Sequence, residues 1–159
     1  MITAILAMDD RCGIGKYGML PWQNKADMKF FKETTRGAGN NTIVMGRKTK
    51  ESLLNWFPLP DRNNLVMTRT PMEEYHITSF GEAIERSSLD GDIFVIGGRE
   101  IYIKAFKEGF VDEVLVSRIK GDYCCDTFLE HEELHKYFRL YSTHKQAQGL
   151  MVEIWKKKD

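Results

Sequence analysis

Asp27 is the residue whose type and placement most clearly suggest chemistry, because it stands five positions after Leu20-Pro21-Trp22 on an otherwise apolar helix face. Helical spacing places Asp27, Met28 and Phe31 on one side of that helix. Even a neutral polar group costs roughly 2–7 kcal/mol when it is buried without a partner, and a charge costs more. Such a carboxylate could hold a flat, polar heterocycle by its edge while Met28 and Phe31 cover the ring. The alternative is an Asp in a first helical turn that only meets the positive end of the helix dipole.

Three junctions further along the chain carry groups suited to phosphate: Gly46-Arg47-Lys48-Thr49, Met67-Thr68-Arg69 and Gly97-Gly98-Arg99. Backbone N–H groups at a helix start bind anions, and paired glycines let a ligand approach the backbone closely. Each junction alone could be an ordinary helix start or an exposed arginine. In open α/β sheets, however, ligands bind at the carboxyl ends of the strands. Together, the three junctions indicate one extended, multiply phosphorylated cofactor.

Short apolar runs alternate with amphipathic segments, which is typical of parallel strands joined by helical crossovers. The expected strands are 2–8, 42–45, 65–68, 93–96 and 114–119, and the expected helices are 25–35, 48–55, 80–87 and 100–107. Two further strand-like runs, 138–144 and 150–156, form a hairpin. We therefore expect one α/β domain over 1–159: a mostly parallel sheet of about eight strands, an antiparallel C-terminal hairpin strand and about four flanking helices.

Composition narrows the possible partners. The 23 basic and 23 acidic residues cancel, so nucleic acid is not expected as a partner. Residues 45–71 hold five basic and two acidic side chains, a local positive patch that suits a small anion. No run is long enough to span a membrane, and the start lacks a secretion signal. Cys12, Cys124 and Cys125 do not form a disulfide pattern, so we expect a cytoplasmic protein.

Two segments match motifs of other protein classes, and we set both matches aside. The segment 13–18 fits GxGxxG, but Pro21 follows within three residues and no helix begins where a dinucleotide fingerprint needs one. The segment 131–135 fits HExxH, the zinc-protease pattern, but no third ligand is evident. We expect a flexible loop at the first and a surface turn at the second, and no metal site.

The order of motifs along the whole chain resembles dihydrofolate reductase, from Met1 to the last strand near Trp155. The segments that carry the resemblance are Leu20-Pro21-Trp22, Asp27, Gly46-Arg47-Lys48-Thr49, Pro58-Leu59-Pro60-Asp61-Arg62-Asn63-Asn64, Ile96-Gly97-Gly98 and Asp126-Thr127-Phe128. Asp at position 27 is similar to the bacterial and phage form. The resemblance implies reduction of 7,8-dihydrofolate to tetrahydrofolate, with hydride transfer from NADPH to C6 and protonation at N5. It also implies a role in one-carbon metabolism, as an enzyme of a class that antifolates target.

The resemblance also assigns residues to roles. It implies that Asp27 grips the pterin through N3 and the 2-amino group, that Arg62 pairs with the substrate's glutamate carboxylate, and that the 9–24 loop closes over the nicotinamide. The implied catalytic group is Asp27, Trp22, Leu20 and Ser117. The implied substrate-binding group is Ala7, Asp27, Met28, Phe31, Leu53, Arg62 and Ile96. The implied cofactor-binding group is Ala7, Ile14, Gly46, Arg47, Lys48, Thr49, Thr68, Arg69, Gly97, Gly98, Arg99 and Tyr102.

Some positions depart from the family pattern. Ser117 stands where the family usually has Thr, and Arg99 where a small residue is common; Glu100 takes a place where Arg can be found. The stretch 55–57 is longer than in compact bacterial members and could reshape the substrate's entrance. Two other functions stay open at this point: an NADPH-dependent reductase of a related pterin or pyrimidine, and a non-catalytic folate or nucleotide binder. We expect a monomer in the cytoplasm, or in a host's cytoplasm if the source is viral.

Overall fold

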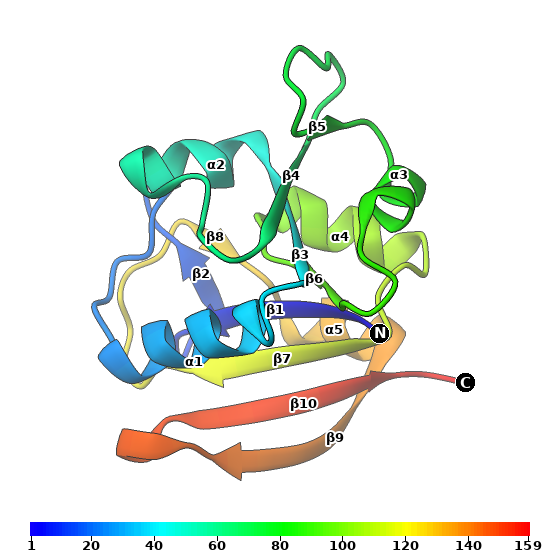
Figure 1. The fold of residues 1–159 in the computed structure, drawn as a ribbon. Helices are drawn as coiled ribbons and strands as arrows, with labels where there is room; N and C mark the ends of the chain where they lie inside the picture. The colour runs from blue at the N-terminus through cyan, green and yellow to red at the C-terminus, as the bar shows by residue number, and fades with distance from the viewer.

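A computed structural model describes all of residues 1–159. Its main feature is an eight-stranded sheet in the order β5-β4-β3-β6-β1-β7-β10-β9 (Figure 1). All neighbouring strands are parallel except β10, which runs antiparallel to both β7 and β9. The strands are β1 Ile2–Met8, β3 Thr42–Gly46, β4 Asn63–Met67, β5 His76–Ile77, β6 Ile93–Val95, β7 Glu113–Arg118, β9 Phe138–Lys145 and β10 Met151–Lys157. This confirms the predicted mostly parallel sheet with an antiparallel C-terminal hairpin strand.

Helices cover both faces of the sheet, and a two-stranded ladder of β2 (Gly13–Gly15) and β8 (Thr127–Phe128) lies beside it. None of the helices is long and apolar enough to cross a membrane. The helical segments are α1 Lys25–Arg36, α2 Arg47–Leu53, the 3₁₀ turns η1 Leu54–Trp56 and η2 Ala147–Gly149, α3 Phe80–Arg86, α4 Arg99–Lys107 and α5 His131–Tyr137.

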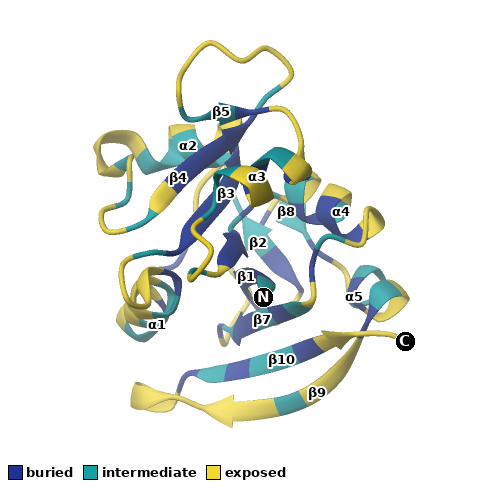
Figure 2. Cartoon of the chain, turned by 45° about the vertical axis from the view of Figure 1, so that its right-hand side comes forward, coloured by how far each residue is buried: buried dark blue, intermediate teal, exposed yellow.

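Strand β1 shows how the core is divided, because its alternate residues face opposite sides of the sheet. Ala4, Leu6 and Met8 belong to the largest apolar cluster, with residues of α3, α4 and α5. Ile5 and Ala7 belong to two smaller clusters on the other face, which partly buried residues of α1 join. Figure 2 shows the buried centre of the sheet. A strand covered on both faces needs a continuous apolar run rather than an alternating one, and β1 has such a run from Ala4 to Met8.

The structure corrects the prediction in three places. It has five α-helices rather than four, because the HExxH segment forms α5 instead of a surface turn. Leu134 of α5 is fully buried in the main core, which explains why a short acidic segment becomes helical. The short strands β2, β5 and β8 were not predicted, and the helix expected over 48–55 ends at Leu53.

Helix α1 begins where its sequence predicts. The Asn24 side chain accepts a hydrogen bond from the Asp27 backbone N–H at 2.9 Å, as an N-cap does. This cap fixes Asp27 in the first turn. The helix ends at Gly37, whose φ of 52° suits glycine. The position of the carboxylate is therefore set by local sequence, and its surroundings by the sheet beneath it.

Candidate active site

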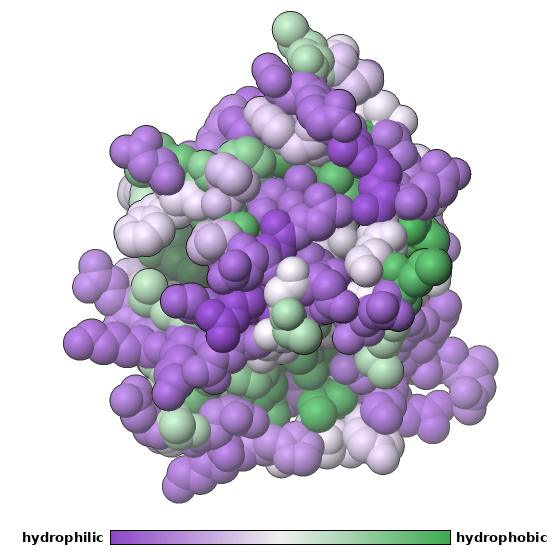
Figure 3. Space-filling model, viewed as in Figure 1, coloured by the Kyte–Doolittle hydropathy of each residue, from purple (hydrophilic) through white to green (hydrophobic).

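Helices α1 and α2 lie over the same face of the sheet, and between them Figure 3 shows a recessed apolar surface. Phe31 of α1, Leu53 of α2 and Ile96 after β6 all pack on the cluster formed by Ile5, Ile43, Met45, Val66 and Phe94. Three residues expected to wall a ring are thus brought together from distant parts of the chain. Met28, in contrast, is 64% exposed and lies outside this packed wall.

Asp27 is buried, with only 7% of its surface exposed, and it forms no ion pair. Burial raises the pKa of the Asp27 carboxyl above its ordinary value, and the nearby Ser117 hydroxyl and Trp22 indole lower it only in part. The Trp22 Nε1–H is itself buried and has no direct hydrogen-bond partner. A carboxylic acid and an N–H donor therefore lie side by side with hydrogen-bonding groups that the protein leaves unpaired. Burying unpaired polar groups costs free energy unless a ligand binds to them.

The neighbours of Asp27 come from two adjacent strands and a loop. Ser117 of β7 stands opposite Ala7 of β1 in the parallel register, so both lie under the start of α1. Trp22 packs with Ala7 in a small buried cluster, and its ring meets Tyr123 edge-on with centroids 5.5 Å apart. Ser117 and Trp22 are therefore far apart in the sequence, but both lie beside Asp27.

The phosphate-type junctions also meet. The Gly46 N–H donates to the Gly97 carbonyl at 2.8 Å, and Gly46 stands opposite Met67 in the sheet. A Cβ at Gly46 would lie 2.8 Å from the Ile101 side chain, and Gly97 has a φ of +115°. Both positions therefore require glycine. The Gly97–Gly98 peptide is cis.

Helices α2 and α4 start side by side at these glycines, and neither start has a side-chain cap. In this they differ from α1 and α3, which Asn24 and Ser79 cap. The first N–H groups of α2 and α4 are thus donors for an anion. Thr49 Oγ1 lies within 3.7 Å of the position that a Cβ on Gly98 would take, which places this hydroxyl at the same spot.

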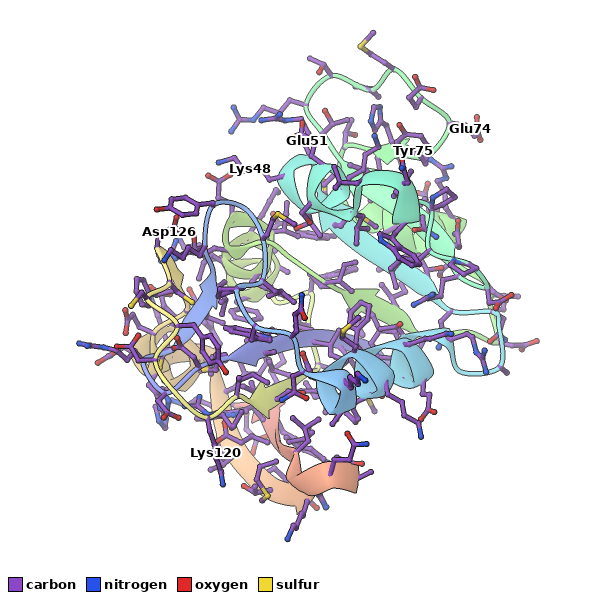
Figure 4. The ribbon with its side chains drawn as sticks, turned by 90° about the vertical axis from the view of Figure 1, so that its left-hand side faces the viewer. Lys48, Glu51, Glu74, Tyr75, Lys120 and Asp126 are labelled. Carbon is purple, nitrogen blue, oxygen red and sulfur yellow. The ribbon has the colours of Figure 1, made fainter.

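The predicted cations differ in availability. Arg47 pairs with Glu51 at 2.7 Å, whereas Lys48 and Arg69 are exposed and have no ion pair. Figure 4 shows Lys48 and Glu51 at helix α2, which lies above α1 in this view. Arg99 donates from Nε to the Phe128 carbonyl at 3.0 Å, which joins the start of α4 to β8.

Two predicted cofactor residues are packed rather than open. Tyr102 is buried behind Gly97, and its hydroxyl donates to the Ile5 carbonyl at 2.7 Å. Burial, with a contribution from the Asp27 charge, raises the Tyr102 pKa far above its ordinary value, so this phenol stays neutral. Ile14 in β2 is half-buried against the main core. Thr68 directly follows β4 and accepts from the Thr70 N–H.

The 9–24 loop is held by two carboxylates whose roles the sequence analysis missed. Asp126 accepts the Tyr17 N–H at 2.9 Å, and its own N–H donates to the Gly15 carbonyl (Figure 4). Asp9 is fully buried; it accepts backbone N–H groups of Arg11, Gly13 and Tyr123 and a contact from the Cys125 thiol. An Asp directly after a buried strand was the available signal for Asp9. Leu20 is exposed on this loop.

Arg62 lies near the far end of α1. Its Nη1 donates to Thr35 Oγ1 at 3.0 Å and its Nε to the Pro60 carbonyl at 2.9 Å, which leaves Nη2 free. Partial burial lowers the pKa of Arg62, but a guanidinium remains charged in proteins. A fixed cation with a free N–H at the end of an apolar cleft suits a carboxylate.

The two set-aside motifs lack the structural context that each pattern requires. Gly13–Gly15 of the GxGxxG match forms β2, and no helix follows it before α1. His131 and His135 lie one turn apart on α5, with both rings edge-on to Trp155. No group of three or more His, Cys, Asp or Glu side chains in the structure could hold a metal ion.

Comparison with known proteins identifies the family. A family model described as dihydrofolate reductase matches residues 1–153. A dihydrofolate reductase of Schistosoma mansoni is 36% identical over 142 residues, which is 80% of this chain and 76% of that protein. One of Bacillus subtilis is 35% identical over 127 residues, or 77% of this chain and 71% of that protein.

A solved structure extends the likeness to the fold. The dihydrofolate reductase from Enterococcus faecalis, complexed with NADP(H) and RAB-propyl, superposes on this chain with a TM-score of 0.83 at 27% sequence identity. The superposition covers 100% of this chain and 97% of the Enterococcus faecalis chain. The relatives come from animals and bacteria alike, so the bacterial or phage subtype stays a prediction. The sequence match and the superposition agree on one conclusion. The chain belongs to the dihydrofolate reductase family.

Proposed function

We propose that Asp27 is the residue that anchors the pterin in the NADPH-dependent reduction of dihydrofolate, the reaction that this chain catalyses as a member of its family. The observation that carries this assignment is the buried, unpaired Asp27 carboxylate beside the unpartnered Trp22 N–H. A pterin ring presents N3–H and a 2-amino group along one edge. Asp27 accepts both hydrogen bonds, and the Phe31, Leu53 and Ile96 side chains cover the ring.

The residues around α2 and α4 fit NADPH. The helix starts at Gly46 and Gly98 suit a pyrophosphate, because no side chain caps their first N–H groups. Lys48 and Arg69 are free to pair with the adenosine 2′-phosphate. When bound, NADPH supplies the hydride; the protein supplies orientation and electrostatics.

Asp27 does not itself deliver the proton to N5, because it grips the opposite edge of the ring. Its charge favours a protonated pterin, and the cationic ring in turn lowers the pKa of the carboxyl that burial has raised. The buried Trp22 N–H holds a water from which N5 is protonated. The 9–24 loop closes this site against bulk water, held in place by Asp126.

Arg62 recognises the carboxylate of the substrate's glutamate through its free Nη2. This feature favours a folate over a simple pterin or pyrimidine. The test is the loss of NADPH absorbance with dihydrofolate, with a pterin that lacks the glutamate, and with neither. Turnover only with the small pterin would contradict the role of Arg62, and tight folate binding without turnover would support a non-catalytic binder.

We also propose that the protein acts as a monomer in the cytoplasm. All the site residues named above come from one chain, and its three cysteines are free thiols. Light scattering coupled to gel filtration measures the molar mass, and 18.5 kDa is expected. A stable dimer at micromolar concentration would contradict the monomer.

A further inference from the structure

The β4–β5 loop, residues 68–75, leaves the end of β4 and projects from the sheet before the chain returns to form β5 (Figure 1). It begins with Thr68 and Arg69, two of the predicted cofactor residues. Residues 69–74 are all exposed, so the loop has no apolar core of its own. The polar contacts that reach this loop therefore decide its conformation, and with it the place of Arg69.

Two of these contacts end on one imidazole ring. The Met72 N–H donates to His76 Nδ1 at 2.9 Å, and the Glu73 N–H donates to the same nitrogen at 3.1 Å. His76 is the first residue of β5, and its own N–H donates to the Glu73 carbonyl at 3.0 Å. A ring nitrogen that accepts hydrogen bonds carries no proton, so this ring is neutral and has its proton on Nε2.

The return of the loop to the sheet is fixed without the His76 ring. Arg86 of α3 donates from Nη1 to the His76 carbonyl at 3.1 Å and from Nη2 to the Glu74 carbonyl. The Thr68 N–H donates to the Ile77 carbonyl at 2.9 Å, which joins the start of the loop to β5. The outer part of the loop, at Met72, is instead held through the His76 ring.

Protonation of His76 removes both ring contacts at once. A protonated Nδ1 is a donor that faces two other donors, and it can accept neither hydrogen bond. Histidine is the side chain that ordinarily changes its charge between pH 5 and 8. The contacts of Arg86 do not change in this range, because a guanidinium stays charged. Acid therefore releases the outer loop while its two ends stay attached.

The charged and titratable groups around the ring come from the loop, α3 and α2. They are Glu73, Glu74, Tyr75, Glu82, Arg86 and Lys50. Arg86 pairs with Glu74 at 3.6 Å and with Glu82 at 3.8 Å, and Lys50 lies beyond the Tyr75 ring. Glu73 forms no ion pair, so its carboxylate is available to a charged imidazole. Strand β4, which pairs with β5, adds no charged side chain.

We propose that His76 is a positioning residue for the cofactor: its neutral ring holds the β4–β5 loop in the form that presents Arg69 to the 2′-phosphate of NADPH, and its protonation releases that loop. This inference rests on the proposed phosphate contact of Arg69. The preference for NADPH over NADH should therefore fall as the pH falls, because NADH has no phosphate for Arg69 to bind.

The first test measures the dissociation constants of NADPH and NADH at pH 7.5 and 5.5 in the wild type, His76→Asn and His76→Ala. The Asn oxygen can accept in place of Nδ1 but does not titrate. The wild type should lose roughly three- to tenfold more of its NADPH preference than His76→Asn, as expected for one or two neutral hydrogen bonds. His76→Ala should have the reduced preference at both pH values, with kcat unchanged.

Two controls isolate the ring. The 2′-phosphate also titrates in this range, but it does so in every variant, so the difference between wild type and His76→Asn reports His76 alone. His144→Asn should behave as the wild type, because His144 lies on β9 at the opposite edge of the sheet from β5. An equal pH dependence of the preference in the wild type and His76→Asn would overturn the proposal.

NMR of the ligand-free protein tests the switch without cofactor. The backbone amide signals of Met72 and Glu73 should shift together with the protonation of the His76 ring, and they should stay constant in His76→Asn. Amide signals that ignore the His76 titration would also overturn the proposal. An unchanged affinity for NADPH in Arg69→Ala at pH 7.5 would instead contradict the phosphate contact under the proposed function, so the two failures are distinguishable.

Discussion

Replacing Asp27 by Asn should make the protein more stable and nearly inactive, and this pair of opposite effects tests the site most sharply. Burial raises the Asp27 pKa, so the folded state disfavours the charged form that neutral pH imposes. Asn is similar in shape but cannot be charged. The substitution therefore removes a cost to folding and, with it, the charge that the pterin requires.

The size of each effect follows from known energies. One unit of pKa shift corresponds to about 1.4 kcal/mol, and a change of 1 kcal/mol moves the Tm of a domain of this size by about 2–4 °C. Each unit by which the Asp27 pKa is raised should therefore appear as a gain of about 3–5 °C in Asp27→Asn. Losing two charge-assisted hydrogen bonds of about 1.5–3 kcal/mol each should slow hydride transfer by roughly 10²–10⁴.

The pH dependence has a definite sign. The cost of Asp27 is complete above its raised folded pKa and disappears as pH falls through it towards the ordinary value of 3.8. The Tm advantage of Asp27→Asn should thus be largest at pH 7 and vanish near pH 4. Calorimetry of the ligand-free protein measures it, and stopped-flow kinetics with NADPH and dihydrofolate measures hydride transfer.

Asp9→Asn is the matched control, because Asp9 is also a buried carboxylate. Burial tends to raise its pKa, but hydrogen bonds from Tyr123, Gly13, Arg11 and Cys125 outweigh this, and the Asp9 pKa is lowered. Its contribution to stability is present above pH 3.8 and is lost as pH falls through the lowered pKa. Leaving one N–H unsatisfied in Asp9→Asn should cost about 1–3 kcal/mol, so Tm should fall. If both variants shifted Tm in the same direction, the electrostatic distinction between the two carboxylates would be wrong.

Three further predictions concern the cofactor, the loop and the turn. Lys48→Ala and Arg69→Ala should each raise KM for NADPH roughly tenfold without changing KM for NADH. Lys120→Ala is the control, because Lys120 lies away from α2 in Figure 4. An equal loss of affinity for both cofactors would contradict a contact with the 2′-phosphate. Asp126→Ala should release the 9–24 loop and lower the single-turnover hydride rate severalfold, whereas an unchanged rate would separate this contact from closure. Leu54→Gly should relieve the positive φ of 51° in turn η1 and raise Tm by about 2–4 °C; a lower Tm in calorimetry would show that the turn is not strained.

Much of the fold could be predicted because its signals are local. Asn24 caps α1 three residues before the Asp27 it positions, and β1 is apolar from Ala4 to Met8 because it is covered on both faces. The C-terminal hairpin was visible as two strand-like runs around a short connection. Strands of two or three residues, such as β5 and β8, carry no periodicity to detect, and α5 forms because Leu134 has a distant core to enter.

The candidate site likewise has features that residue types predict and features that only the fold decides. Residue types alone singled out Asp27 and the paired glycines, because a carboxylate on an apolar face and glycines at strand ends have few structural uses, whereas the role of Arg62 came from the family resemblance. Helical spacing predicted that Met28 covers a ring and the resemblance implied that Tyr102 borders the cofactor; both stay predictions, and the structure adds that Met28 is largely exposed and that Tyr102 is buried behind Gly97. A side chain's orientation depends on what the sheet brings beneath it.

The sequence by itself determined most of the longer strands and helices, where α1 begins and which groups have the chemistry to bind a pterin and phosphates. Only the tertiary structure decided that Asp27 is unpaired, that Trp22 lacks a partner, that Asp9 and Asp126 hold the 9–24 loop, and that the His76 ring holds the β4–β5 loop. The physical reason is range. Caps and apolar runs act over a few residues. Burial and charge pairing instead depend on strands and loops that are far apart in the chain and meet only when the sheet assembles.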